Sequence, residues 1–533
     1  MELYDLIVIG SGSGLDVAVA ASNFGKKVAI IEKGALGGTC LNKGCIPSKM
    51  LIHSADVAEA IKRAELFGIK TSGFAVNFGS LVKRVTDEVD GESAGIEAAL
   101  QRSSNPRLYK GQCRFTAPRT IEVAGQTIAA EKVLIAAGSR PNIPPIKGLA
   151  GTGFMTSDEA LRLTRQPASL AILGGGYIAA ELAHFYGSLG TKVTIVQRGG
   201  LLIPSEDEDV SQHFTHIMGE KYSVYTRSEA VEVSRSNGVY SVTIMNTQTR
   251  ARSVINSDAL LVAVGRVPNS DLLGLQNAGV RVDSRGYVIT DDYLETTSPG
   301  TFALGDIIGR FQFKHAANHE ADYALQNILA PEQKMAVDYY AMPHAIFASP
   351  QIAGVGKTER QLKEEGARYV VAKWNYIDSG MGQAIEDKTG FVKFLLDPTS
   401  LVILGCHIMG TDAASIIHEV IVAMRCGHGS IMNILGAIHI HPALPEVIRR
   451  AASNFRTMQH EHDGESHEHE HEHEHEHEHE HEHEHEHEHE HEHEHEHEHE
   501  HEHEHEHEHE QEPPHQHEHT REGGGTAPGP NTP

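Results

Sequence analysis

Two stretches of the chain share one arrangement of apolar and polar positions. An apolar run over residues 3–9 is followed by a glycine-rich turn at residues 10–14, a helical pattern to about Phe24 and a second apolar run over residues 28–31. The same order returns over residues 169–197. A strand, a glycine turn, a helix and a strand form a dinucleotide-binding unit, in which the pyrophosphate lies at the helix N-terminus. The pattern therefore predicts two dinucleotide sites, which a hydride relay between two cofactors requires.

The rest of the chain divides into a third folded part and a tail. Residues 338–458 combine strand patterns at Gly390 to Leu396 and Leu401 to Ile408 with a helical pattern at Ala413 to Arg425, and predict an α+β domain. Residues His467 to Glu510 form an unbroken His-Glu repeat. Because this repeat has no apolar face to bury, we expect the tail to be disordered.

Charge is distributed unevenly between the body and the tail. The 533-residue chain has a formal charge of −28, and the segment from Gln459 onward, with 28 acidic residues and one arginine, carries −27 of it. A nearly neutral body argues against a nucleic-acid partner, which needs clustered positive charge. No apolar run reaches the roughly 18–20 residues that span a bilayer, and no signal peptide precedes the first strand. We therefore expect no membrane partner and a cytoplasmic location.

The five cysteines are too few for a disulfide scaffold in a chain of this size. Cys113, Cys406 and Cys426 have no cysteine partner nearby in the sequence, and we expect them to be small buried residues. Cys40 and Cys45 lie in the segment GGTCLNKGCIPSK. At the start of a helix, their spacing allows a disulfide across little more than one turn, and the helix N-terminus lowers the pKa of a thiol. A zinc site would need a second Cys/His pair at ligand spacing, which the body lacks, so the pair is predicted to be redox-active.

This segment resembles the active site of the pyridine nucleotide-disulfide oxidoreductases, the family of dihydrolipoamide dehydrogenase, glutathione reductase and mycothione reductase. The resemblance covers about residues 3–455. It recurs in four further motifs, which are Ala136-Ala-Gly-Ser-Arg-Pro141, Gly174-Gly-Gly-Tyr-Ile-Ala-Ala-Glu181, Gly265-Arg-Val-Pro-Asn269 and Thr301-Phe-Ala-Leu-Gly-Asp306. Any one of these motifs alone would be weak evidence, but their combination is specific.

The resemblance implies a role for each residue of the electron path. Cys45 would be the sulfur that faces the flavin, and Cys40 the sulfur that exchanges with the substrate. Asp306 is similar to the aspartate that binds the FAD ribitol. Lys49 is similar to the lysine near flavin N5, with Glu181 as its partner.

The cofactor-binding positions lie in the same motifs. Glu32, at the end of the second strand of the first unit, can accept hydrogen bonds from a ribose. The first turn departs from the usual fingerprint because its third glycine position is Leu15, so we expect helix and strand to pack differently there. The full predicted set is Gly10, Gly12, Glu32, Thr39, Lys49, Gly138, Gly174, Gly176, Tyr177, Glu181, Arg198, Gly265 and Asp306.

A second motif, Ile438-His-Ile-His-Pro-Ala-Leu-Pro-Glu446, supplies a proton carrier. Thiol-disulfide exchange needs a group that takes a proton from the attacking thiol and returns it to the leaving one, and imidazole titrates in the right range. His441 and Glu446 resemble the family's His-Glu pair, which reaches the active site of the other subunit. The resemblance therefore implies a homodimer with active sites shared between subunits.

The sequence favours two kinds of disulfide substrate. No cysteine follows Cys426, which argues against mercuric reductase and the large thioredoxin reductases, and the paired cysteines argue against coenzyme A disulfide reductases and NADH oxidases. Cys-Ile-Pro-Ser-Lys is similar to dihydrolipoamide dehydrogenase. The first glycine turn, the segment from Lys314 to Glu320 and the segment from His441 to Glu446 are more similar to mycothione reductase. We predict a dihydrolipoamide dehydrogenase-like enzyme for a small dithiol, disulfide or lipoyl domain, and as the alternative a reductase of a low-molecular-weight thiol disulfide.

The nucleotide is predicted from one position. Where an NAD site would place a carboxylate on the adenosine ribose, the chain has Gln197 followed by Arg198. An arginine there can pair with a 2′-phosphate, which favours NADPH over NADH.

These predictions define the fold class and the domains. The fold is α/β, with two Rossmann-like dinucleotide-binding domains for FAD and NAD(P), an α+β dimerisation domain and a disordered His-Glu tail. The FAD domain is discontinuous. The predicted boundaries are 1–145 with 270–335 for FAD, 146–269 for NAD(P), 338–458 for dimerisation and 459–533 for the tail. Imidazole and carboxylate ligands in the tail also suit divalent transition metals, which adds metal binding as a separate prediction.

Overall fold

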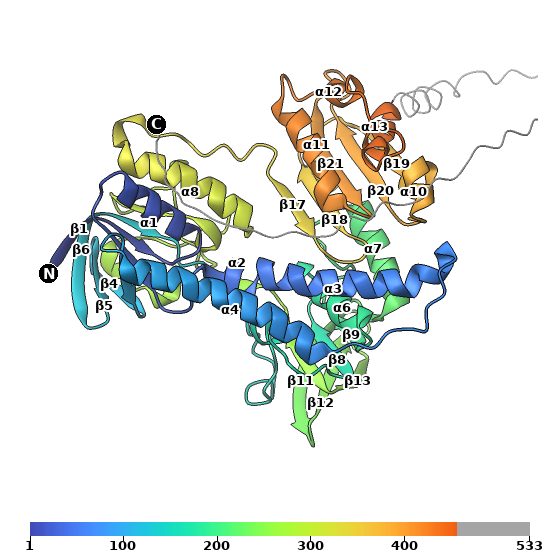
Figure 1. The fold of residues 1–533 in the computed structure, drawn as a ribbon, viewed down its shortest axis with the longest axis horizontal. Coiled ribbons are helices and arrows are strands. Elements are labelled where there is room, and N and C mark those ends of the chain that lie inside the picture. The colour runs from blue at the N-terminus through green and yellow to red at the C-terminus, as the bar shows by residue number, and fades with distance from the viewer. Residues whose placement is uncertain (456–533) are drawn as a thin grey trace, which may run out of the picture. The chain divides into compact units, whose positions relative to one another are not determined.

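The computed structural model describes residues 1–455, in which the strands form separate sheets (Figure 1). The predicted disorder and metal binding of the tail therefore lie outside the described residues. A seven-stranded sheet has the order β3-β2-β1-β6-β5-β4, with β16 also paired to β6. Its strands are β1 (Glu2–Ile9), β2 (Val28–Glu32), β3 (Arg107–Lys110), β4 (Cys113–Ala117), β5 (Thr120–Val123), β6 (Gln126–Ile135) and β16 (Thr301–Ala303). Pairing of β16 brings a late part of the chain back to the first sheet.

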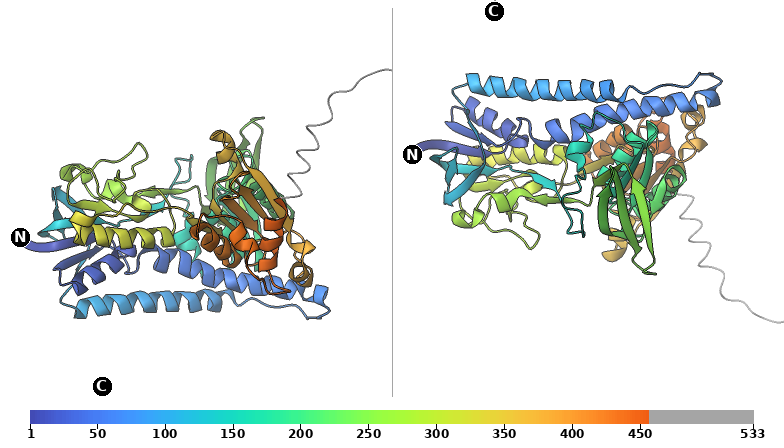
Figure 2. Two further views of the ribbon diagram at one scale, coloured as in Figure 1. Left: turned by 90° about the horizontal axis from the view of Figure 1, so that it is seen from above. Right: turned by 90° about the horizontal axis from the view of Figure 1, so that it is seen from below.

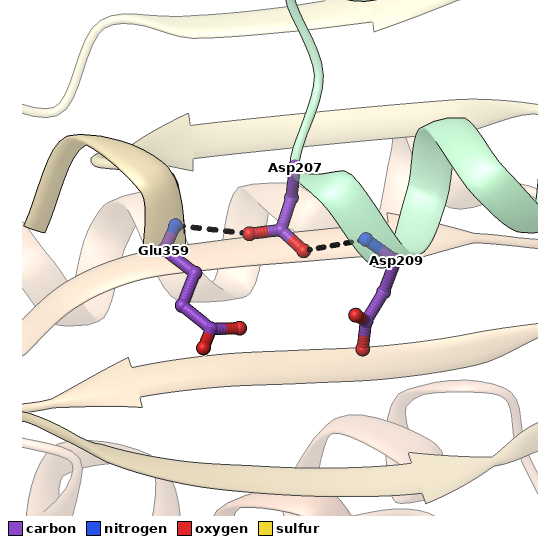
Figure 3. A group of neighbouring side chains, drawn as sticks. All are labelled: Asp207, Asp209 and Glu359. Carbon is purple, nitrogen blue, oxygen red and sulfur yellow. Dashed lines mark hydrogen bonds between the residues drawn. The ribbon is translucent and has the colours of Figure 1, made fainter. Parts of the chain in front are cut away.

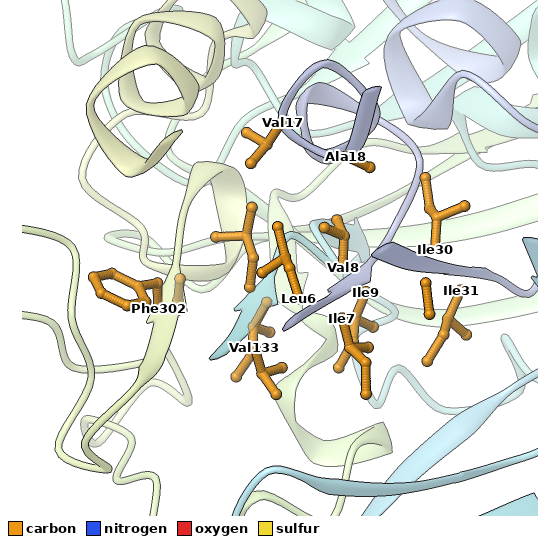
Figure 4. Close-up of a cluster of buried hydrophobic side chains, with 14 of the residues drawn as sticks. Leu6, Ile7, Val8, Ile9, Val17, Ala18, Ile30, Ile31, Val133 and Phe302 are labelled. Carbon is orange, nitrogen blue, oxygen red and sulfur yellow. The ribbon is translucent and has the colours of Figure 1, made fainter. Parts of the chain in front are cut away.

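The apolar run of β1 is buried on both faces of this sheet (Figure 4). Leu6, Ile7, Val8 and Ile9 are each at most 4% exposed, as expected for a strand covered on both sides. Helix α1 (Ser13–Asn23) covers one face, and α8 (Lys314–Leu329) packs beside it. The buried strand ends at the glycine turn, so that turn is fixed by the core beneath it.

Close packing of α1 on the sheet depends on Gly14. A Cβ atom at this position would lie 2.8 Å from Val8 and 2.9 Å from Ala136, closer than real side chains approach. Leu15 is partly buried and packs against the same core. Gly14, which allows the close approach, stands one position before Leu15, where the usual fingerprint has its third glycine.

The second dinucleotide unit forms a parallel sheet of order β10-β9-β8-β14. An antiparallel sheet of order β11-β12-β13 accompanies it. The elements are β8 (Ser169–Leu173), α6 (Tyr177–Ser188), β9 (Lys192–Val196), α7 (Glu208–Lys221), β10 (Ser223–Tyr225), β11 (Ser228–Ser236), β12 (Val239–Asn246), β13 (Arg252–Ser257) and β14 (Ala259–Val262). Short strands β7 (Ser139–Pro141) and β15 (Arg266–Pro268) pair with each other.

The third part is an antiparallel sheet of order β17-β18-β21-β20-β19, with α11 packed on β18 and α13 on β19. The predicted helix over residues 413–425 matches α11, and the two predicted strands match β20 and β21 within two residues. The elements are β17 (Pro343–Ile346), β18 (Ile352–Gly356), α9 (Glu359–Glu364), β19 (Val370–Asn375), α10 (Gly380–Ala384), β20 (Phe391–Leu396), β21 (Ile403–Met409), α11 (Ala413–Arg425), α12 (Met432–Leu435) and α13 (Pro445–Ser453).

Two long helices, α3 (Cys45–Arg63) and α4 (Phe78–Arg102), run together along one side of the molecule (Figure 2). The short helix α2 (Gly38–Lys43) contacts both α3 and α4, and the short helix α5 (Ser157–Ala160) contacts β14. Helix α3 also packs along α6 and so joins the first sheet to the second unit. Among the described helices, none is long and apolar enough to cross a bilayer.

A buried charge cluster joins the second unit to the third (Figure 3). Asp207, which precedes α7, accepts hydrogen bonds from the backbone of Asp209 and of Glu359. The three carboxylates would resemble a cation site if they stood alone. The Lys393 ammonium, however, lies 2.8 Å from Asp207, 3.4 Å from Asp209 and 2.6 Å from Glu359, so a lysine already takes the place of a metal cation. Lys373 and Lys363 pair with Asp209 and Glu359 in addition, so three lysines balance the three carboxylates.

Removal of Lys393 should destabilise the protein strongly. Its side chain is 1% exposed and that of Asp207 is fully buried, so Lys393→Met would leave the buried carboxylate of Asp207 without its cation. We expect the free energy of unfolding to fall by about 3–5 kcal/mol, measured by urea unfolding. The exposed pair of Lys147 and Glu232 is the control, where Lys147→Met should cost under about 1 kcal/mol. Equal effects in the two variants would contradict this reading of the cluster.

Candidate active site

The two redox cysteines lie on different helices. The sequence predicted a single helix start, but α2, which carries Cys40, ends at Lys43, and Cys45 is the first residue of α3. Gly44 separates the two helices, and a Cβ atom on it would lie 2.9 Å from the carbonyl oxygen of Thr39. The single-helix prediction was therefore wrong, because the backbone at Gly44, with φ of −143° and ψ of −119°, is not helical and interrupts the helix. Cys45 does occupy a helix N-terminus, where backbone N–H groups favour a thiolate.

The thiols of Cys40 and Cys45 are both free and interact with each other. A hydrogen bond from Cys40, and then the nearby charge of Lys49, lower the pKa of Cys45 to about 6. The same hydrogen bond, together with burial, raises the pKa of Cys40. Within one chain, Cys45 therefore holds the negative charge and Cys40 holds the proton. Cys40 needs a base from elsewhere before it can act as a nucleophile.

An ion pair lies one turn along α3 from Cys45. The Lys49 ammonium lies 2.9 Å from both carboxylate oxygens of Glu181 on α6. The Phe347 backbone N–H donates to Glu181 over 3.1 Å, and the Phe347 ring centroid lies 4.7 Å from the Lys49 ammonium. The predicted pair therefore exists. Phe347, which follows β17 and which the sequence did not suggest, completes it.

The first glycine turn has the shape of a pyrophosphate cradle. Gly10 has a φ of +103°, and a Cβ atom there would lie 2.2 Å from the carbonyl oxygen of Ala136. A Cβ atom on Gly38 would lie 2.6 Å from the Cα of Gly12, so the start of α2 also closes on this turn. Glu32 accepts hydrogen bonds from the backbone and hydroxyl of Ser11. These features fit a dinucleotide with its pyrophosphate at the start of α1.

A cavity beside Glu32 continues this cradle. Its lining includes two residues that the sequence analysis missed, Gln112 and Asn269. Asn269 also donates a hydrogen bond to the carbonyl oxygen of Ala137 over 2.7 Å. Its position in the motif from Gly265 to Asn269 could have indicated that it lies at the site.

Asp306 lies in a polar network that joins three of the motifs. Its carboxylate accepts a hydrogen bond from Ser139 over 2.5 Å, and Ser139 accepts one from Arg266 over 2.7 Å. Gly138 and Gly265 flank these residues and have φ values of +63° and +104°. The structure therefore brings together residues that are widely separated in the sequence.

The second glycine turn repeats the first. Gly174 has a φ of +114°, and a Cβ atom there would lie 2.2 Å from the carbonyl oxygen of Ala263. Gly176 caps α6, and Tyr177 is its first residue. Tyr177 is 37% exposed and lies near the charges of Arg266 and Asp306. The turn and its tyrosine therefore face the same side as the first cofactor's predicted residues.

Two exposed arginines lie beyond the second turn. Arg198 follows β9, as the sequence predicted. Arg227 comes from the connection between β10 and β11, and its guanidinium lies 3.4 Å from a Cβ atom built on Gly200. Within the described residues, neither guanidinium takes part in an ion pair. Arg227 was not predicted from the sequence, because helix α7 separates it from Arg198 along the chain.

His441 and Glu446 are paired as predicted. The Nδ1 atom of His441 lies 2.9 Å from both carboxylate oxygens of Glu446, and this hydrogen bond lowers the pKa of Glu446. The His441 side chain is 68% exposed. Its neighbours Ile438 and Ile440 are 102% and 80% exposed, an unusual density of apolar surface. No hydrogen bond joins His441 to Cys40 within the described part of this single chain.

The structure corrects one cysteine prediction and adds a lysine. Cys113 and Cys406 are buried as expected, but Cys426 is exposed because it follows the last residue of α11 at the surface. Lys314, at the start of α8, lies near enough to Cys40 to lower its pKa, although other effects outweigh it. Lys314 also donates to Ser13 over 2.9 Å. The Lys314 segment was part of the family resemblance but not of the predicted site.

Two family models together match most of the chain. Residues 4–321 match the sequence model described as pyridine nucleotide-disulphide oxidoreductase, and residues 342–452 match that family's dimerisation domain. Both matches end before the His-Glu tail, so they give no support to metal binding there.

Curated relatives include enzymes of two substrate types. The chain is 38% identical over 469 residues to mycothione reductase of Mycobacterium tuberculosis, covering 86% of this chain and all of that one. It is 34% identical over 463 residues to mitochondrial dihydrolipoyl dehydrogenase of Dictyostelium discoideum, covering 85% and 94% of the two chains.

A solved structure has the same fold. The Cu(II) complex of the HOCl-induced flavoprotein disulfide reductase RclA from Escherichia coli aligns with a TM-score of 0.76 and 28% identity, covering 85% of this chain and 99% of the other. With the paired cysteines, two glycine cradles and a dimerisation domain in place, the chain belongs to the pyridine nucleotide-disulfide oxidoreductase family and is a flavin-dependent disulfide oxidoreductase that uses FAD and NAD(P)H.

Proposed function

We propose that this enzyme reduces a low-molecular-weight thiol disulfide with electrons from NADPH. The observation that carries the proposal is the presence of Arg198 and Arg227 beyond the second glycine turn, where a 2′-phosphate would lie. The 38% identity to a mycothione reductase supports the same substrate class. The sequence alone had favoured the dihydrolipoamide dehydrogenase-like enzyme over this reductase. A dihydrolipoamide dehydrogenase-like activity is the second candidate, supported by the Cys-Ile-Pro-Ser-Lys segment and the 34% identity to a dihydrolipoyl dehydrogenase.

The predicted domain boundaries and location are part of this proposal. The return of β16 to the sheet of β1 supports a discontinuous FAD domain. The exposed Ile438 and Ile440 beside His441, between α12 and α13, support a dimer interface on the third part of the chain. A cytoplasmic location completes the proposal.

The residues of the site have distinct proposed roles. Gly10, Gly12, Glu32, Thr39, Gly138 and Asp306 would hold FAD, while Gly174, Gly176, Tyr177, Gly265 and Arg198 would hold or border the nicotinamide nucleotide. Bound FAD supplies the transfer of an electron pair from NAD(P)H to the Cys40–Cys45 disulfide. Lys49, held by Glu181, keeps a positive charge near Cys45 and so stabilises the thiolate that reduction creates.

Substrate reduction then follows from thiol-disulfide exchange. His441 of the partner subunit takes the proton from Cys40, and the Cys40 thiolate attacks one substrate sulfur. A Cys40–substrate disulfide forms, and the first substrate thiolate leaves with the proton from the imidazolium. Cys45 next attacks the sulfur of Cys40, which restores the Cys40–Cys45 disulfide and releases the second thiolate. Glu446 orients the imidazole and stabilises its charge throughout.

Nucleotide and substrate preference can be measured together. We expect a higher kcat/KM with NADPH than with NADH for mycothione disulfide, and slower turnover of dihydrolipoamide with NAD or NADP. Arg198→Ala should lower kcat/KM for NADPH by about 10-fold or more, because a charged hydrogen bond is lost, and leave NADH nearly unchanged. Arg250→Ala, an exposed arginine in the same region of the chain, is the control. A preference for NADH with dihydrolipoamide turnover as the fastest reaction would support the second candidate instead.

Alkylation of the reduced enzyme should follow the pKa of Cys45. Only a thiolate reacts, so the rate at Cys45 should fall as the pH drops through about 6. The measurement is iodoacetamide labelling over a pH series, with each cysteine peptide quantified by mass spectrometry. A Cys45 midpoint at the ordinary thiol value of about 8.5 would contradict the assigned thiolate.

Mixed dimers test whether the active site is shared. Cys40→Ser and His441→Gln should each slow disulfide reduction by about 10²-fold or more. Mixing the two variants should restore activity, because one of the two sites in each mixed dimer then contains both native groups. Mixing Cys40→Ser with Cys45→Ser is the matched control and should restore nothing, since both residues serve the same half-site. No recovery in verified mixed dimers would mean that the sites are not shared.

A further inference from the structure

Helices α3 and α6 contact each other through polar groups at two levels. At the first level Lys49 pairs with Glu181. Seven residues further along α3, Asp56 contacts His184, which lies one turn beyond Glu181 on α6. Residues seven apart lie on the same helix face, so both links lie on one seam between the helices.

His184 is the buried member of the second link. It is 1% exposed as a residue, whereas the Asp56 side chain is 43% exposed. Its Nε2 lies 2.7 Å from the Asp56 carboxylate, and its Nδ1 lies 3.0 Å from the hydroxyl of Ser188. Both ring nitrogens are therefore bonded, one across the seam and one within α6. A buried imidazole without these partners would be costly.

The link to Asp56 persists in either protonation state of the ring. In the neutral form, Nε2–H donates to Asp56 and the Ser188 hydroxyl donates to Nδ1. In the protonated form, both nitrogens donate, and the Ser188 oxygen accepts. The carboxylate of Asp56 is an acceptor in both cases, so the contact does not depend on which form is present.

Apolar packing along this seam includes small side chains on both helices. Ala55, Ala58, Ala180 and Ala183 are buried in a cluster that also contains the larger Leu51 and Phe185. Small side chains allow close approach, but they resist axial sliding less than interlocking large ones do. Buried polar pairs are the better-attested means of setting register between helices. Two polar pairs at separate levels constrain both the position and the angle of α3 on α6.

We propose that His184 is a positioning residue that holds α3 in register with α6 and thereby keeps Glu181 beside Lys49 and Cys45. The inference rests on the proposed role of the Lys49–Glu181 pair near the redox cysteines. It does not depend on which disulfide or nucleotide the enzyme uses, so its test reads the cysteine rather than turnover.

The test is whether loss of His184 uncouples Glu181 from Cys45. The Glu181 carboxylate raises the pKa of Cys45, although other groups outweigh it, so Glu181→Gln should lower that pKa in the native background. With His184→Leu, the same Glu181→Gln change should shift the pKa by half as much or less. The pKa is read from pH-dependent iodoacetamide labelling of Cys45 in the holoenzyme reduced with dithiothreitol.

Three further variants separate positioning from simple loss of packing. His184→Gln, whose amide can still donate to Asp56, should retain most of the native shift. Ser188→Ala removes a contact of Ser188 with Glu59 on α3 but leaves the link to Asp56 in place, and it should also retain most of the native shift. Asp56→Ala breaks the link from the half-exposed side and should behave like His184→Leu, which keeps the test valid if His184→Leu does not fold. An equal Glu181→Gln shift in the native and Asp56→Ala backgrounds would overturn the proposal.

Discussion

Helix α3 lies along helix α6, with the Lys49–Glu181 pair bonded between them, and the proposed electron path depends on this contact. Cys45 begins one helix and Tyr177 begins the other. Packing of the two helices therefore places the redox cysteine of one nucleotide-binding unit beside the nucleotide turn of the second. A lysine ammonium is strongly hydrated and sits on a flexible stem, so it keeps its charge near Cys45 only where the surrounding structure fixes it. Phe347, which follows β17, contacts both members of the pair and helps to fix them.

A tight backbone turn positions each end of this path. Gly10 and Gly174 both adopt conformations that side chains disfavour, and a Cβ atom on either would overlap a carbonyl oxygen of a neighbouring strand end. Each turn follows a buried strand and precedes a helix, so the core fixes where the helix begins. The proposed proton carrier is organised differently. His441 is exposed on the surface of its own chain, which suits a group that acts on a second copy.

Local signals in the sequence predicted the parts of the fold that short segments determine. Both glycine turns, the α11 helix and the His441–Glu446 pair are set by residues close together in the chain, so their patterns were readable. The break at Gly44 was missed because a five-residue cysteine spacing fits one helix as well as two. Cys426 was misjudged because burial depends on where a helix ends relative to the core.

Contacts between distant segments could not be predicted from the sequence alone. Lys393 meets Asp207 across 186 positions, and His184 meets Asp56 across 128, with no pattern in either segment to indicate the partner. Arg227 lies near Gly200 only because β9 and β10 are neighbours in the sheet. Family resemblance supplied the Lys49–Glu181 pair, which local reasoning would have treated as an ordinary surface ion pair.

The central claim is that Cys40 and Cys45 form the redox pair that takes electrons from the nicotinamide nucleotide. Differential thiol labelling of the holoenzyme under anaerobic conditions, before and after one equivalent of NADPH, tests it most directly. We expect both cysteines to resist labelling in the oxidised enzyme and both to become labelled after reduction, while buried Cys113 and Cys406 stay unlabelled in each state. Unchanged labelling of Cys40 and Cys45 after the flavin has been reduced would contradict it.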